Sequence, residues 1–283
     1  MSFRFGPQVI TLDNYKEVFK VCSPDILDEI RLAILDDVPI GQYIQLCGQD
    51  YYKLNQIRKA IREMVPSEYL NISFSYKVLK SIREGLQKGY DMSGLLSYAN
   101  DKGVLIDIKS LEVIADFMSN GINLDMLDFR KVPAQQVELF CKGVLNNYPM
   151  WLLLGDKIYS ESYIRLLMRG MQLGLDIHPF LEVEWEEDNL LLLFSFVNKV
   201  NINDVLTKIT SKFPSETLKI LLNLISAQYD VDELCKRDKE GYPIFNTFQI
   251  DALSNAIYKG TLTREMLNPN LSAKSIQDLV DKT

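Results

Sequence analysis

The side chains most able to bind a partner or take part in chemistry gather in two charged clusters. The stretch from Tyr51 to Tyr90 holds eight basic residues against three acidic ones, inside a chain of net charge −7. The first cluster, which we name the basic row, consists of Arg31, Arg58, Arg62, Lys80 and Arg83. The second, which we name the acidic pole, consists of Glu182, Glu184, Trp185, Glu186 and Glu187. Dense charge of one sign attracts a partner of the other sign, so both clusters are candidate binding sites.

The basic row has a functional and a structural interpretation. Arg31, Arg58 and Arg83 each follow an isoleucine at the same place in a repeated sequence pattern, so stacked repeats would align them. Aligned guanidinium groups would suit a phosphate backbone or an acidic protein segment. In the structural interpretation, the arginines pair with acidic residues of the neighbouring repeat or simply face solvent.

The acidic pole has two interpretations as well. Trp185 as an exposed aromatic side chain among negative charges would help to dock a basic partner, or the charges would imitate a nucleic acid. Alternatively, the stretch is a solvated loop whose acidic residues lie at the positive N-terminal end of the next helix.

Residues for catalysis or metal binding are not apparent. No nucleotide-binding, zinc-protease or serine-hydrolase motif occurs, and the single histidine, His178, excludes mechanisms that use two. We expect His178 at the surface, near the start of a short helix. The four cysteines Cys22, Cys47, Cys141 and Cys235 are widely spaced, which predicts buried free thiols. We therefore predict no catalytic residues, no metal and no cofactor.

Charge and hydropathy narrow the class of partner. The net charge of −7 and a pI near 5.0 oppose non-specific binding to nucleic acids and anionic membranes. The strongest apolar run, Leu190 to Val197, is far shorter than the roughly 18 residues that span a bilayer. We expect a cytoplasmic protein that does not enter a membrane.

The elements that would position these clusters follow a pattern that returns about every 27 residues. Each copy has an amphipathic helix, a turn, a capping position and a short apolar stretch. The capping positions are Pro39, Pro66, Asp91, Asn123, Pro149, Asp176, Asn201, Asp230 and Leu262. Asp and Asn accept hydrogen bonds from the free amides of a starting helix, and Pro has no amide to satisfy. The capping position therefore predicts the start of a second helix.

Glycine marks the end of the first helix in several copies. Gly89, Gly121, Gly174 and Gly260 lie two residues before the capping position, where a left-handed residue ends a helix. Other copies have Asp37, Asn147 or Gln228 there, which predicts a less uniform stop. Each repeat is expected to form a helix of about twelve residues, a tight turn and a helix of about eight. Neither helix buries its apolar face alone, so the repeats must stack.

We therefore predict an all-α fold, a right-handed α-solenoid of about nine two-helix repeats. Residues 1–283 would form a single continuous domain, with an N-terminal cap at 1–22, repeats at 23–271 and a C-terminal capping helix at 272–283.

Two copies carry a resemblance to a known group of proteins. The sequences from Ile82 to Ser93 and from Met168 to Ile177 resemble the I-R-x-G-L-x-x-G-L-D-V-S repeats of proteins encoded by gut Firmicutes and their mobile elements. More broadly, the array resembles armadillo/HEAT-type solenoids. The resemblance implies a helical-repeat fold and no defined activity, and a phage or other mobile-element origin would suit an inhibitor or adaptor.

The function expected from the sequence is a non-enzymatic scaffold that binds a protein partner, in its sharpest form an inhibitor or adaptor directed at a host protein. The alternative is a nucleic-acid-binding repeat protein that uses the basic row. A third possibility is an enzyme with a carboxylate pair that no motif reveals. The oligomeric state is open.

Overall fold

The chain is mostly helical in the computed structural model, which describes every residue except 1, 101, 102 and 156. Helices take 55% of the residues and strands 4%, so the predicted all-α class is confirmed. The chain forms two compact units, Met1–Lys157 and Ile158–Thr283, which we describe one at a time. The single continuous domain stays a prediction.

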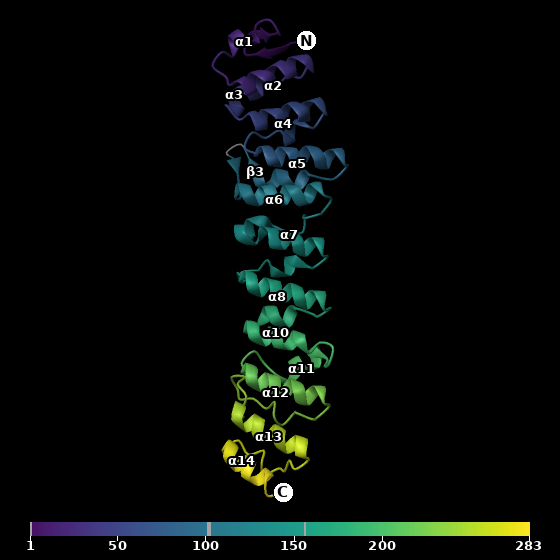
Figure 1. The fold of residues 1–283 in the computed structure, drawn as a ribbon, viewed down its shortest axis with the longest axis vertical. Coiled ribbons are helices and arrows are strands. Elements are labelled where there is room, and N and C mark those ends of the chain that lie inside the picture. Colours follow the sequence, from purple (N-terminus) through teal and green to yellow (C-terminus); the bar gives the residue numbers. More distant parts are fainter. Residues whose placement is uncertain (1, 101–102, 156) are drawn as a thin grey trace. The chain divides into compact units, whose positions relative to one another are not determined.

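Within its described residues, the first unit is built on five long helices that pack in sequence order, each against the next (Figure 1). They are α2 (Pro24–Leu35), α4 (Tyr51–Arg62), α5 (Tyr76–Gln87), α6 (Ile108–Ser119) and α7 (Val137–Leu145). Short elements join them: α3 (Gly41–Cys47), η1 (Ser67–Tyr69), η2 (Ser93–Tyr98), β3 (Ala99–Asn100), β4 (Gly103–Val104), η3 (Phe129–Lys131), η4 (Ala134–Gln136) and η5 (Met150–Leu153). The η elements are 3₁₀-helices.

The second unit repeats this arrangement with five more long helices (Figure 1). They are α8 (Glu161–Gln172), α10 (Glu187–Ser195), α12 (Ser215–Ser226), α13 (Thr247–Lys259) and α14 (Ala273–Val280). The short helices α9 (His178–Glu182) and α11 (Ile202–Lys208) lie between them. Here too each long helix contacts the next, and α14 is the helix expected near the C-terminus.

The predicted N-terminal cap is partly a β-structure. Strands β1 (Phe3–Phe5) and β2 (Gln8–Ile10) pair antiparallel, and the short helix α1 (Tyr15–Val18) follows. Strand β1 packs against α3 so closely that only glycine fits at position 41. A Cβ at Gly41 would lie 2.0 Å from the backbone oxygen of Arg4. The hairpin thus packs on α3 and buries its own side chains Phe3 and Ile10.

Polar side chains start most of the long helices. In seven of those described, the residue before the helix accepts a hydrogen bond from a backbone N–H in the first turn. These N-caps are Ser23, Asp50, Ser75, Asp107, Ser160, Asn246 and Ser272. Each cap satisfies an amide that the helix itself leaves free.

The long helices end far more uniformly than the sequence predicts. At eight of the nine expected stops the backbone is left-handed, with φ between 57° and 84°. These residues are Asp37, Met64, Gly89, Gly121, Asn147, Gly174, Gln228 and Gly260. In the copy at Gly89, the Gly89 N–H donates to the oxygen of Leu86 and the Tyr90 N–H donates to the oxygen of Gly85, both at 3.0 Å. The same pair of bonds closes the other seven, which makes each a Schellman motif.

Five of the nine capping positions accept a hydrogen bond as predicted, but several of the second helices are shorter than expected. The side-chain oxygens of Asp91, Asn123, Asp176, Asn201 and Asp230 each accept the backbone N–H two residues later, at 2.8 to 3.0 Å. The second helix of about eight residues that we expected forms nearly at full length in α3 and α11, with seven residues each, but other copies have shorter 3₁₀-helices, such as η1 with three residues and η5 with four.

Chain length explains the short elements. A twelve-residue helix is about 18 Å long, and the chain must return over that distance before the next parallel helix starts. Only eight residues separate Pro66 from Ser75, and as an α-helix they would rise about 12 Å. 3₁₀-helix and extended backbone cover the distance, because they rise about 2 Å or more per residue.

Close packing joins the end of each long helix to the segment that follows it. Met92 and Met150 are fully buried and lie one residue after a capping position. Their side chains fill the space above Gly85 and Gly143: a Cβ at Gly143 would lie 2.2 Å from the sulfur of Met150. Glycine at these places therefore makes room for the methionine.

Replacing Gly143 by Ala tests this packing. We expect Gly143→Ala to lower the free energy of unfolding by about 1–3 kcal/mol, because the overpacked Met150 must move, even though Ala favours a helix by about 1 kcal/mol. Urea unfolding followed by circular dichroism measures the change. The double variant Gly143→Ala/Met150→Ala should lose less than the sum of the two single variants, and strict additivity would contradict the contact.

Candidate functional site

Arg58, at the centre of the basic row, lies buried between α2 and α4. Its side chain is 7% exposed, its Nε donates to Glu29 at 2.7 Å and its Nη1 donates to Asp36. Glu29 also accepts from Asn55 at 2.7 Å. A buried guanidinium held by two carboxylates cannot reach a partner at the surface.

Arg83 repeats this arrangement one helix later. Its Nη1 lies 2.9 Å from Glu63, and its Nε donates to Gln56 at 3.3 Å. Asp36 and Glu63 each directly follow a long helix as its C-cap residue, and Glu29 and Gln56 lie seven residues before them. The arginines of α4 and α5 therefore bond to the same two sequence positions of the preceding long helix. We call this arrangement the arginine ladder.

The remaining members of the basic row are exposed. Arg31 pairs with Asp28 of its own helix at 2.7 Å, Arg62 lies 3.5 Å from Asp36, and Lys80 lies 3.8 Å from Glu84. The structure therefore favours the structural interpretation for Arg58 and Arg83. Binding of a partner by the row as a whole stays a prediction.

The acidic pole differs from expectation at its aromatic residue. Trp185 is 5% exposed, not at the surface, because its ring packs edge-on against Phe180 with centroids 5.9 Å apart. Its backbone N–H also donates to the hydroxyl of Tyr163 at 3.3 Å. Trp185 therefore cannot serve as the exposed aromatic contact that the sequence suggested.

The acidic residues around Trp185 are exposed and lie at the start of α10. Glu182 ends α9, and Glu184 lies in the link between the two helices. Glu186 is the N-cap position of α10, and Glu187 lies in its first turn, where it accepts a hydrogen bond from Ser160 at 3.2 Å. Negative charge here stabilises the positive end of the helix, as the structural interpretation expected.

Other reactive groups are held in structural roles. His178 is exposed, and its Nδ1 lies 2.6 Å from Asp176. The backbone N–H and ring of His178 together lower the pKa of Asp176. Burial raises the pKa of Cys47 to about 11 and those of Cys141 and Cys235 to about 12. Cys22 is only half-buried.

Two further kinds of feature are absent from the part of the chain that the structure describes. No group of three or more His, Cys, Asp or Glu residues there is placed to hold a metal ion. No helix there combines the length and apolar character needed to cross a lipid bilayer.

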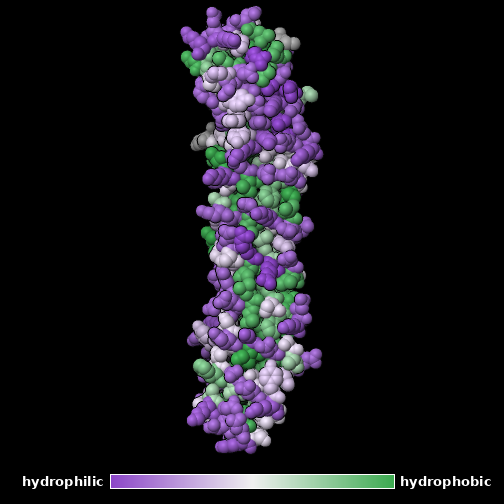
Figure 2. Space-filling view, viewed as in Figure 1, coloured by the Kyte–Doolittle hydropathy of each residue, from purple (hydrophilic) through white to green (hydrophobic). Residues whose placement is uncertain are grey.

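A groove that the sequence analysis missed runs along α5, α6 and the start of α7. Its volume is about 890 Å³, and half-buried Val113 and Phe117 line it together with exposed Ile108. Charged residues surround these apolar ones: Lys77, Lys80, Glu84, Asp107, Lys109, Glu112, Asp116 and Glu138. Figure 2 shows hydrophobic residues reaching the viewed face over α6 and α7, among hydrophilic ones.

The sequence does contain a signal for this groove. Helix α6 has its core stripe at Leu111, Ile114 and Met118, which are all buried. Val113 and Phe117 form a second apolar pair with i, i+4 spacing, outside that stripe. A second stripe on one helix indicates an additional apolar contact surface.

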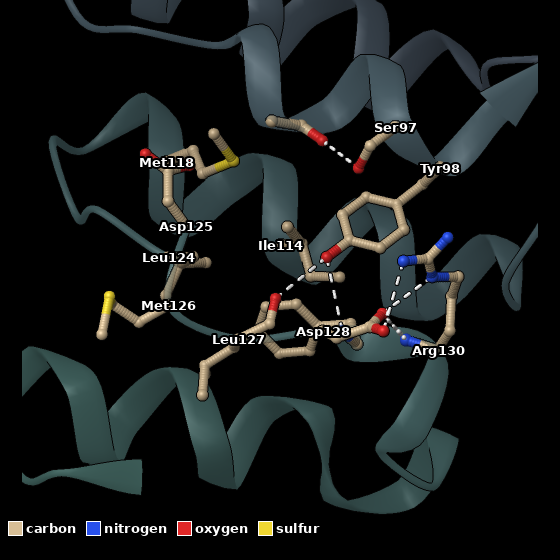
Figure 3. Close-up of a pocket in the computed structure, with 12 residues that line it drawn as sticks. Ser97, Tyr98, Ile114, Met118, Leu124, Asp125, Met126, Leu127, Asp128 and Arg130 are labelled. Atoms are coloured by element: carbon tan, nitrogen blue, oxygen red, sulfur yellow. Dashed lines mark hydrogen bonds and ion pairs between the residues drawn. The ribbon is translucent and has the colours of Figure 1, made fainter. Parts of the chain in front are cut away.

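A smaller pocket, about 310 Å³ in volume, lies between η2 and the segment that follows α6 (Figure 3). The Tyr98 hydroxyl donates to the oxygen of Leu127 at 3.2 Å and accepts from the N–H of Phe129 at 3.3 Å. Arg130 binds Asp128 at 2.8 Å and, by this hydrogen bond, lowers the pKa of the Asp128 carboxyl. The polar groups of Tyr98, Asp128 and Arg130 on this side of the pocket are therefore already paired within the protein.

No protein-family model matches the chain, and neither a curated protein nor a solved structure matches it. The class that the fold defines is a protein of stacked long helices joined by short return segments.

Removing Arg58 should destabilise the protein far more than removing Arg31. We expect Arg58→Ala to cost about 3–5 kcal/mol of unfolding free energy, because Glu29 is left buried without its partner. Arg31→Ala, which breaks an exposed pair, should cost at most about 1 kcal/mol. The double variant Arg58→Met/Glu29→Leu should recover most of the loss. Urea unfolding measures all three, and equal small effects would show that the ladder contributes little.

The cysteines should differ sharply in reactivity. At pH 8 we expect a disulfide reagent such as DTNB to modify Cys22 first, since the other three thiols are buried with a pKa raised to about 11 or 12. In denaturant all four should react at similar rates. Peptide mass spectrometry identifies the modified residue, and early labelling of Cys141 would contradict the burial.

Proposed function

We propose that this chain is a non-enzymatic scaffold that binds a segment of another protein. We further propose that its helices form a right-handed α-solenoid of about nine two-helix repeats. Support comes from the packing of each long helix on the next within each compact unit, and from the recurrent Schellman stops. Rigid stacked helices present side chains at fixed spacing, which suits a partner that lies across several of them.

The observation that carries the proposal is the groove along α5, α6 and α7. Its apolar residues Ile108, Val113 and Phe117 belong to one regular helix and are surrounded by charged residues. An apolar centre with a polar rim is typical of protein-binding surfaces. Because all three side chains stand on a capped helix, the surface is already formed before the partner arrives.

The nucleic-acid alternative has less support. Arg58 and Arg83 would be its principal phosphate contacts, and both are engaged by carboxylates of the protein. The net charge of −7 also repels a polyanion. An adaptor or inhibitor that acts on a protein of a host cell is the specific form of the scaffold function we favour.

Comparing captured proteins tests the proposal. The full chain, the groove variant Val113→Ser/Phe117→Ser and a control variant Phe248→Ser would each be used to capture proteins from a lysate of the source cell. Phe248 is 78% exposed on α13, outside the groove. We expect at least one protein that the parent and control retain after nuclease treatment and that the groove variant loses at least tenfold.

Two outcomes would overturn the proposal. The same proteins bound by all three chains would exclude the groove, and loss of all bound material on nuclease treatment would favour the nucleic-acid alternative. Thermal melting followed by circular dichroism checks that each variant is folded.

A further inference from the structure

Two adjoining pockets lie on the side of the first compact unit where the return segments run. The first is the pocket of Figure 3, and the second, about 260 Å³ in volume, is lined by the turns at Gly89 and Gly121. Met118 and Asp125 line both. The two pockets therefore share the carboxylate of Asp125 and the thioether of Met118.

Apolar side chains share the wall around this meeting point with polar groups. Ile114, Met118 and Leu124 are buried, and Met126 is 66% exposed at the opening. Gly94 keeps the space open, since a Cβ there would lie 3.1 Å from an oxygen of Asp125. A ligand that fits such a wall has both an apolar part and a polar part.

The charges around the pockets are mostly negative. The linings contain three carboxylates, those of Asp91, Asp125 and Asp128, and one cation, Arg130, which binds Asp128. The N–H of Ser93 donates to the carboxyl of Asp91 and lowers its pKa. Asp125 makes no side-chain hydrogen bond or ion pair with the rest of the described chain. In Figure 3 its carboxylate lies beside Met118, across the pocket from Asp128 and Arg130.

We propose that these pockets receive a lysine or arginine side chain of a partner protein. The alkyl stem lies against Met118, Leu124 and Met126, and the cationic head pairs with the carboxylate of Asp125. Long basic side chains combine an apolar stem with a charged end, which is the combination that this wall and this carboxylate complement. The inference shares with the proposed function only the class of partner, because this site is separate from the groove of α5, α6 and α7.

Nuclear magnetic resonance of methyl-labelled methionines gives a direct test. The probe is the peptide Ac-Gly-Ala-Arg-Ala-Gly-NH2, and its control is the same peptide with citrulline, which has the shape of arginine without the charge. We expect the Arg peptide to shift the methyl signals of Met118 and Met126 in a saturable manner. Met266, buried in the other compact unit, should not move. The citrulline peptide should shift the signals at least fivefold less at equal concentration.

Protein variants make the test specific to Asp125. Asp125→Asn should weaken binding at least fivefold, whereas Asp251→Asn, at an exposed position of α13, should leave it unchanged. The Val113→Ser/Phe117→Ser variant should also bind the peptide normally, so failure of this inference and failure of the proposed function are distinguishable. Equal shifts with both peptides, no shift with either, or an unchanged affinity of Asp125→Asn would each overturn the inference.

Discussion

The reversal of the backbone after each long helix is the constraint on which the rest of the structure depends. Consecutive long helices pack as neighbours only if the chain leaves each helix sharply and returns. The left-handed residue and its two hydrogen bonds achieve the exit within three residues. A non-glycine residue in this conformation costs about 1 kcal/mol or more, yet Asp37, Met64, Asn147 and Gln228 all adopt it. The packing around each turn therefore holds the backbone in this conformation even where the residue itself disfavours it.

The return segments explain where the cavities are. Because they cover the length of a helix with few residues, they are 3₁₀-helices and extended chain, which pack less regularly than α-helices against each other. The pockets around Asp125 lie between two such segments. On the other side the long helices present regular faces, and the space there is a shallow groove between ridges of side chains. The two candidate sites thus arise from the two kinds of backbone in each repeat.

Much of the helical framework could be predicted from the sequence. Gly89, Gly174 and the Asp or Asn two residues later mark the stops and caps directly, because few residue types satisfy those geometries. Met64 gives no such signal, since its left-handed backbone is imposed by the turn and not by its own preference. The N-terminal hairpin was missed because two strands of three residues are too short to show a period.

The sites were harder to predict, because exposure depends on contacts between helices. Arg58 and Trp185 look accessible in the sequence and are buried, the first by carboxylates of α2 and the second by Phe180.

The arginine ladder also has a direction. The repeat that contains α4 carries both halves of the contact: Arg58 reaches back to α2, while Gln56 and Glu63 receive Arg83 from α5. The α2 repeat only accepts hydrogen bonds in the ladder, because its own Arg31 bonds within the same helix. The ladder stops after α5, because the residue that follows this helix is the cation Lys88 in place of a carboxylate. The α4 repeat is thus complementary to a copy of itself in head-to-tail order. Tandem duplication of this segment would lengthen the array without leaving a buried charge unpaired. Exchanging its order with either neighbour would separate Arg58 from its carboxylate partners and leave a buried charge unpaired.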